Sequence, residues 1–265
     1  KIAAARPDLV HALVGMGQVV DMQRGEALSY RFALDAARAD RNAMYYRIAE
    51  LAEEKLLDSA AAMEVYVRAL KESPLDEKAG EEVERLAGQV DGGWEKLANA
   101  YADVTGENEN EEVRATIGKR LARVFEEELG DVTNAEETYR YVLSVRPLEA
   151  DALANLDRIC TALEKWSEVA EVLEKRVQAV TDKADLVDLY ARLGETYEEK
   201  LAKPDDAIRS YRRIFDELDK AHEGAIQALE RLYMQKGAYP ELLVVHEREL
   251  ENAVGEVAEA DIRAK

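Results

Sequence analysis

The sequence contains three dipeptides in which an acidic residue is followed by an arginine, and they are evenly spaced. They are Glu84-Arg85, Asp157-Arg158 and Glu230-Arg231, and each lies about 73 residues from the next. A planar guanidinium binds a carboxylate through two parallel hydrogen bonds, so a row of arginines could hold an acidic peptide or a chain terminus. Alternatively, each arginine could bond a carboxylate of an adjacent helix and only fix the packing. The residues alone leave both interpretations open.

The other residues with reactive side chains do not form a catalytic or metal-binding motif. The sole cysteine, Cys160, and the three histidines, His11, His222 and His246, are not in metal-ligand spacing with one another. We interpret Cys160 as a small buried hydrophobe and His246 as a partly buried packing residue. The sequence has no glycine-rich phosphate loop and no nucleophile elbow. We therefore expect a protein without cofactor or metal that is not an enzyme.

A repeat of about 73 residues must position these side chains. Tyrosines recur with this period at positions 66, 139 and 211. An alanine precedes each tyrosine by four positions and a leucine precedes each by ten. The same period relates the apolar residues Leu86, Ile159 and Leu232, and the aromatic residues Trp94, Trp166 and Tyr239. Such self-similarity is the signature of a repeat architecture, in which each unit packs on its neighbours.

Within each repeat, apolar residues recur every three or four positions, which predicts amphipathic helices joined by short turns. Short turns make neighbouring helices antiparallel. The sequence therefore predicts an all-α fold, a right-handed α-solenoid of antiparallel helix pairs. It should contain about 14 helices, at 8–20, 24–38, 41–57, 59–72, 76–90, 92–104, 108–130, 132–145, 149–164, 166–180, 184–201, 204–217, 222–236 and 239–253.

We expect the whole chain, 1–265, to form a single solenoid. Its parts would be a degenerate repeat at 1–40, double-repeat units at 41–110, 111–183 and 184–253, and the start of a further helix at 254–265. The stretch 105–110 contains no apolar residue, which predicts a mobile loop or a frayed helix start. The chain opens without methionine, and we expect it to be a piece of a longer protein.

The pattern of small and large residues resembles the tetratricopeptide repeat (TPR) family. The best match runs through Leu229, Tyr233, Gly237, Tyr239 and Leu250. In that family a glycine or alanine lets two helices approach closely, and an aromatic ring of the partner helix fills the gap. The resemblance implies a TPR-like superhelix and says little about a specific function.

The resemblance also implies a position for the arginines. In the family this position lies on the first helix of each pair and faces the concave groove, which makes candidate partner-binding residues of Arg85, Arg158 and Arg231, with Arg123 at the similar place in an intervening copy. The acidic neighbours depart from the family pattern, because Glu84, Asp157 and Glu230 stand where it usually has a small residue. All three copies depart from the family pattern in the same way, so we expect a ligand to bind near these acidic–arginine dipeptides.

The balance of charge restricts the partners. There are 36 Lys and Arg against 56 Asp and Glu, a net charge of −20, with a pI near 4.7. Nucleic-acid affinity depends on cations that neutralise phosphates, so RNA binding is disfavoured and we expect no nucleic acid. If the arginine row is exposed, the groove suits acidic ligands. If carboxylates neutralise that row, the groove is acidic and a basic ligand is preferred.

These observations favour a non-enzymatic scaffold that binds a peptide or helical segment of a partner protein in the concave groove. The alternative is a structural spacer or self-association arm of a larger multidomain protein. No apolar run approaches the roughly 20 residues needed to cross a bilayer, so we expect no direct membrane insertion. A single cysteine fits the cytoplasm, although a periplasmic protein could look the same.

Overall fold

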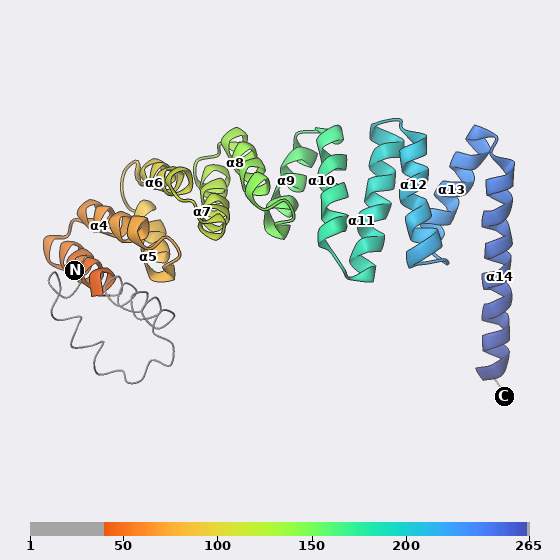
Figure 1. The fold of residues 1–265 in the computed structure, drawn as a ribbon, viewed down its shortest axis with the longest axis horizontal. Helices are drawn as coiled ribbons and strands as arrows, with labels where there is room; N and C mark the ends of the chain where they lie inside the picture. The colour runs from red at the N-terminus through yellow and green to blue at the C-terminus, as the bar shows by residue number, and fades with distance from the viewer. Residues whose placement is uncertain (1–39, 264–265) are drawn as a thin grey trace, which may run out of the picture. The chain divides into compact units, whose positions relative to one another are not determined.

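A computed structural model describes the backbone of residues 40–263 and the side chains of residues 40–252. Every regular element in that range is a helix, which confirms the all-α solenoid (Figure 1). The predicted helices 8–20 and 24–38, together with His11, lie outside the described residues. The chain forms two compact units, residues 1–131 and 132–265, and each is described by itself. Among the helices described, none combines the length and the apolar character needed to cross a bilayer.

Unit 1 is a series of helices connected by short turns. It consists of a helix over residues 40–56, α4 (Ser59–Glu72), α5 (Glu77–Ala87), α6 (Gly93–Glu107) and α7 (Glu111–Arg123), which continues as the π-helical turn η1 (Val124–Glu128). Each helix packs against the one that follows it, and α4 also touches α6.

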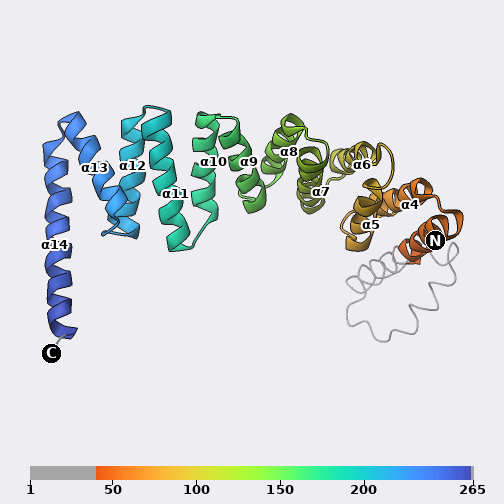
Figure 2. The same ribbon diagram turned by 180° about the vertical axis from the view of Figure 1, so that it is seen from behind.

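Unit 2 is also a series of helices connected by short turns (Figure 2). Its elements are α8 (Val132–Val145), α9 (Ala150–Ala162), α10 (Trp166–Ala179), α11 (Lys183–Glu195) with η2 (Thr196–Lys200), α12 (Pro204–Arg213) with η3 (Ile214–Leu218), α13 (Glu223–Lys236) and α14 (Tyr239–Arg263). Below, α5, α7, α9, α11 and α13 are called the A helices, because each is the first helix of a predicted repeat.

Polar residues just before the helices explain where many of them begin. Asp58, Asp76, Asn110 and Asp182 each accept a hydrogen bond from a backbone N–H in the first turn of the helix that follows, at 2.8–3.0 Å. Such caps satisfy N–H groups that have no partner within the helix. Pro204 opens α12, where its missing N–H costs nothing.

Two predicted boundaries differ from the structure. α14 continues unbroken to Arg263, where we expected an end at 253 and a new helix from 254. Helix α6 extends to Glu107, so the expected loop at 105–110 is reduced to 108–110. Thr105 belongs to the packed part of α6, because it is buried and its hydroxyl donates to the carbonyl groups of Tyr101 and Ala102 of the same helix.

The repeat tyrosines form the core, as their spacing predicts. Tyr66, Tyr139 and Tyr211 are 2%, 3% and 4% exposed. Gly194 of α11 shows why a small residue accompanies the ring, because a Cβ atom at this glycine would lie 2.6 Å from Cζ of Tyr211. This contact is the close approach of paired helices that the resemblance implies.

The turns inside the helix pairs share a left-handed backbone conformation. One series of equivalent positions is Leu57, Gly130 and Ala202, with φ of 54°, 65° and 52°. A second series is Gly92, Glu164 and Gly237, with φ of 62°, 53° and 66°. Both series keep the period of the sequence repeat, so the repeat determines the turn geometry even where the residue is not glycine.

Candidate protein-binding surface

Arg85 lies on α5 and is fully engaged with carboxylates. Its two terminal nitrogens donate to Glu53 of the helix over residues 40–56 at 2.9 and 2.7 Å, and its Nε donates to Glu82 at 2.8 Å. The hydrogen bonds from Arg85 lower the pKa of the Glu53 carboxyl, and the same bonds raise the pKa of the guanidinium. The Arg85 side chain is 40% exposed, but no nitrogen of its guanidinium lacks an acceptor.

Arg123, near the end of α7, contacts the acidic residue that precedes Arg85. Its Nη2 donates to Oε2 of Glu84 at 2.8 Å, and the other oxygen of Glu84 accepts from the hydroxyl of Tyr101 at 2.8 Å. Burial, together with Glu84, raises the pKa of the Tyr101 hydroxyl, so this group stays a donor. Glu84 therefore ties α5 to both α6 and α7.

In unit 2 the corresponding acidic residue is Asp157 of α9, and it is 2% exposed. Arg192 of α11 donates to both of its oxygens, at 2.6 and 2.8 Å, and Arg176 of α10 donates to Oδ2 as well. The adjacent Arg158 points elsewhere and donates to Asn155 of its own helix at 3.3 Å. Asp157 thus joins three helices, as Glu84 does in unit 1.

The last dipeptide lies on α13. Arg231 donates from Nε and Nη2 to the carboxylate of Glu198 in η2, at 2.8 and 2.9 Å. Its neighbour Glu230 lies 3.1 Å from Nδ1 of His246 on α14, and Glu249 lies 3.0 Å from the same nitrogen. The His246 side chain is 51% exposed, so the prediction of a partly buried packing residue is wrong. A helix-periodic position was mistaken for one that faces the core.

For Arg85, Arg123 and Arg231, the structure shows a guanidinium bound to a carboxylate of another helix, as in the packing interpretation. The residues that the sequence analysis missed are their acceptors and the arginines that bind Asp157. Arg176 is 19 residues from Asp157, and the other pairs are 32 to 39 residues apart, close to the length of one helix pair. That spacing was the available signal. Binding of a partner by the four candidate arginines, Arg85, Arg123, Arg158 and Arg231, stays a prediction.

The A helices of unit 2 also carry carboxylates with no cation bound. Glu195 of α11 stands at the repeat position that Arg231 occupies on α13, because Leu193-Gly194 aligns with Leu229-Glu230. Glu195 and Asp188, two turns apart on the same helix, are exposed and have no ion pair within the described residues. The uncommitted charge on α11 is therefore negative.

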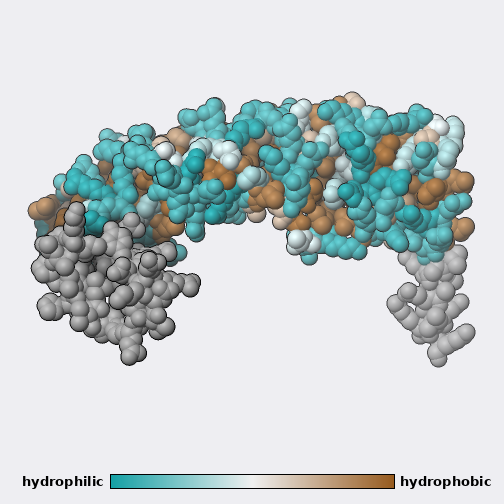
Figure 3. All heavy atoms as spheres, in the orientation of Figure 1, coloured by the Kyte–Doolittle hydropathy of each residue, from teal (hydrophilic) through white to brown (hydrophobic). Residues whose placement is uncertain are grey.

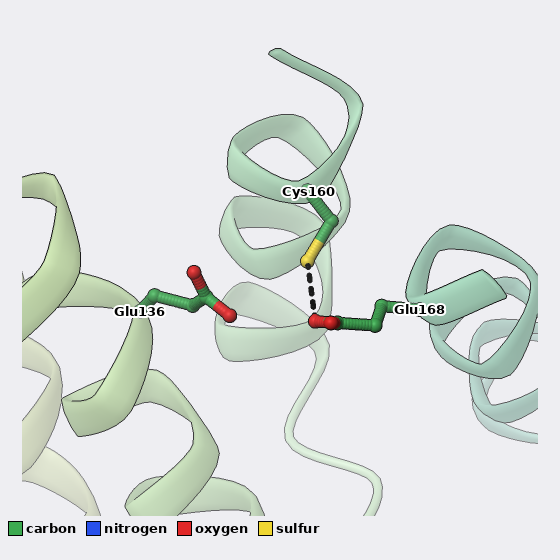
Figure 4. A group of neighbouring side chains, drawn as sticks. All are labelled: Glu136, Cys160 and Glu168. Carbon is green, nitrogen blue, oxygen red and sulfur yellow. Dashed lines mark hydrogen bonds between the residues drawn. The ribbon is translucent and has the colours of Figure 1, made fainter. Parts of the chain in front are cut away.

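Cys160 of α9 lies among charged side chains of α8 and α10. Figure 4 shows its thiol beside Glu136 of α8 and Glu168 of α10, and the thiol donates to Glu168 at 3.8 Å. Burial raises the pKa of Cys160 to about 11. The side chain is 0% exposed, which confirms that Cys160 is buried, although its thiol meets a carboxylate.

The donor atoms of this cluster lie within 4.8 Å of one another, close enough to consider a metal ion. Two cations already balance the carboxylates, however. Arg140 donates to both Glu136 and Glu168, and Lys165 donates to Glu136 at 2.7 Å. We therefore interpret the cluster as an ion-pair network that holds α8, α9 and α10 together.

Two segments of the chain match the tetratricopeptide repeat family model, residues 152–187 and 225–258. They correspond to α9 with α10 and to α13 with α14. Repeats of this family are typically non-catalytic and bind protein partners. No curated protein matches the chain in sequence.

The solved structures to which the chain is similar include the following three. MamA shares 18% identity, with 63% of this chain and 92% of MamA covered, at a TM-score of 0.37. A tetratricopeptide repeat protein from Parabacteroides merdae shares 15% identity, with 80% of each chain covered, at a TM-score of 0.39. Acl4, the assembly chaperone of RpL4, shares 16% identity, with 83% of this chain and 96% of the Acl4 chain covered, at a TM-score of 0.29.

Proposed function

We propose that this chain, a tetratricopeptide-like helical repeat protein and thus a protein–protein interaction scaffold, binds a basic segment of its partner on the A helices of unit 2, a surface called here the A-helix face. The observation that carries the proposal is the state of the charges on that face. There Arg231 is bound to Glu198, whereas Glu195 and Asp188 have no cation among the described residues.

An acidic ligand would have to displace a resident glutamate from an arginine and leave that glutamate without its ion pair. A basic segment incurs no such cost, because it meets carboxylates that are still free. The net charge of −20 adds a long-range attraction for cations, which mainly raises the association rate at low salt. The proposal therefore selects the second of the two ligand classes that the sequence left open.

Site-specific crosslinking tests this proposal. A photoreactive amino acid at position 195 should form an adduct with a basic segment of a partner in the source cell. The same group at Glu171 of α10, a helix that is not an A helix, should not. The double variant Asp188→Lys, Glu195→Lys should abolish binding of the partner so identified, and Glu171→Lys should leave it unchanged. An adduct that maps to an acidic segment, or that survives the charge reversal, would overturn the proposal.

A further inference from the structure

The last helix of unit 2 presents an apolar stripe to solvent. Tyr239, Leu243 and Leu250 of α14 are 68%, 58% and 67% exposed, and Val244 is 44% exposed. Their spacing places them on one side of the helix, opposite the buried Val245. Figure 3 shows apolar atoms on the first half of α14, at the right end of the view. Exposed apolar side chains that gather in this way mark an interaction surface.

An acidic residue lies within the stripe. Glu247 follows Leu243 by one turn and precedes Leu250 by one turn, and Glu251 follows Glu247. Both glutamates are exposed and have no ion pair within the described residues. The cation nearest in sequence, Arg248, is turned away and donates to Asp216 at 2.7 Å. The surface therefore combines apolar side chains with uncompensated negative charge.

The repeat supplies a template for what covers such a surface. One repeat earlier, Ala170 and Glu174 of α10 occupy the positions equivalent to Leu243 and Glu247. There the following helix packs on the equivalent side: Ala170 is 2% exposed, and Glu174 accepts a hydrogen bond from Tyr197 of η2 at 2.6 Å. At this repeat position, Glu174 of α10 accepts a hydrogen bond from the element that follows it, whereas Glu247 of α14 has no donor among the described residues.

We propose that this face of α14, formed by Tyr239, Leu243, Val244, Glu247 and Leu250, docks a basic amphipathic helix of a partner protein. The α10 template indicates a helix that brings a hydrogen-bond donor to the glutamate between two apolar contacts. The second acidic residue, Glu251, and the net charge of −20 favour lysine or arginine as that donor. Two copies of α14 would instead place Glu247 and Glu251 near their own counterparts, which disfavours self-pairing. The inference rests on the proposed scaffold function but concerns a different surface from the A-helix face.

A labelled helical peptide tests the docking directly. The basic peptide KLAKLAKKLAKLAK should bind the full chain in a fluorescence anisotropy titration, and the acidic counterpart ELAELAEELAELAE should not. Leu243→Glu with Leu250→Glu should weaken binding of the basic peptide by about tenfold or more. The matched control is Leu148→Glu with Leu163→Glu, which alters two apolar residues of unit 2 that are each 46% exposed and lie outside α14, and it should bind as the parent does.

The charge is tested separately. Glu247→Lys with Glu251→Lys should remove binding of the basic peptide and create binding of the acidic one, because the apolar contacts remain. Equal binding of both peptides to the parent chain, or unchanged binding by the charge-reversed variant, would overturn the proposal. So would light scattering that shows a dimer dissociated by Leu243→Glu, since a second copy would then be the occupant. Crosslinking at position 195 should be unaffected by these α14 variants, so this inference and the A-helix proposal can fail independently.

Discussion

Asp157 is a charged residue that is almost completely buried. The side chain is 2% exposed, and its oxygens accept from Arg176 and Arg192 on the two following helices. A buried carboxylate is tolerated only when such donors satisfy it. Both arginines remain partly exposed, at 27% and 41%, so the cluster is strongly paired without being wholly dry.

Replacement of this carboxylate should be costly. Asp157→Asn keeps the shape but leaves two guanidinium groups facing a neutral amide, and we expect unit 2 to lose about 2–3 kcal/mol of unfolding free energy. Urea denaturation followed by circular dichroism measures the loss. Asp188→Asn, at an exposed carboxylate without a cation, serves as the control and should change stability by less than about 0.5 kcal/mol. A similar small effect for both variants would show that Asp157 is not a structural anchor.

Cys160 gives a second prediction, because burial raises its pKa from 9.0 to about 11. At pH 8 a shift of two units lowers the thiolate fraction about 100-fold, so alkylation by iodoacetamide should be at least that much slower in the native chain than in urea. The raised pKa also means that the folded state holds this proton more tightly. Its contribution to stability should be complete below pH 9 and should decline as the pH rises toward 11. Equal alkylation rates in both states would contradict the burial.

The arginines illustrate what sequence reasoning can and cannot provide at this scale. Their regular spacing identified equivalent positions, and the acidic neighbours were noticed as departures from the family pattern. Which carboxylate each guanidinium meets depends on the rotation of neighbouring helices and on side-chain rotamers. Neither is encoded in spacing along one helix, so the partners Glu53 and Glu198 emerged only from the structure.

At the scale of the element, the turns inside the helix pairs are the least expected feature. Glycine adopts positive φ without strain, and Gly130, Gly92 and Gly237 use that freedom. Leu57, Glu164 and Ala202 adopt the same conformation at equivalent positions, where a side chain costs about 1–2 kcal/mol. The packing of the paired helices imposes the conformation. At these three positions the sequence has no glycine that would indicate a positive φ.

Glycine at the strained positions should therefore stabilise the fold. We expect Ala202→Gly and Glu164→Gly each to raise the unfolding free energy by about 0.5–1 kcal/mol, as relief of strain exceeds the added entropy of the unfolded chain. Leu163→Gly is the matched control. Its φ is −88°, so the substitution should destabilise the chain instead. Differential scanning calorimetry of the three variants would reveal the opposite signs.

Helices were predicted far better than their surroundings. Twelve helices of the described range follow the predicted series, because apolar periodicity and short turns are local signals. The end of α14 was predicted too early because Asn252 and Gly255 are typical of a helix end, whereas the helix continues through both. The family model also matches α9 with α10, although Asp157 and Val169 depart from the expected small residues there.

At the scale of the whole molecule, each unit is an array in which a helix contacts mainly its neighbours. Such arrays unfold as a sum of local terms and not as one cooperative body. The organisation as a single solenoid with double-repeat boundaries at 110 and 183 stays a prediction. Overall charge and repeat length were readable from the sequence, whereas the division into two compact units depends on contacts that the repeat pattern does not reveal.

This organisation predicts which helices a destabilising substitution affects. In Asp157→Asn, hydrogen exchange measured by mass spectrometry should accelerate in α9, α10 and α11, because those helices share the lost carboxylate. Protection of α4 and α5 in unit 1 should be unchanged. Uniform loss of protection across both units would show that the chain unfolds as one body.

The separation of the ion-pair partners has a consequence for the speed of folding. The pairs that join alternate helices span 32 to 39 residues, and Asp157 and Arg176 of adjacent helices are 19 residues apart. Closing each loop therefore costs little chain entropy and needs no distant segment to be in place. Chains with such low contact order fold quickly and can nucleate at any point along the array. Each helix pair can therefore begin to acquire its native contacts during synthesis, soon after the next pair has left the ribosome.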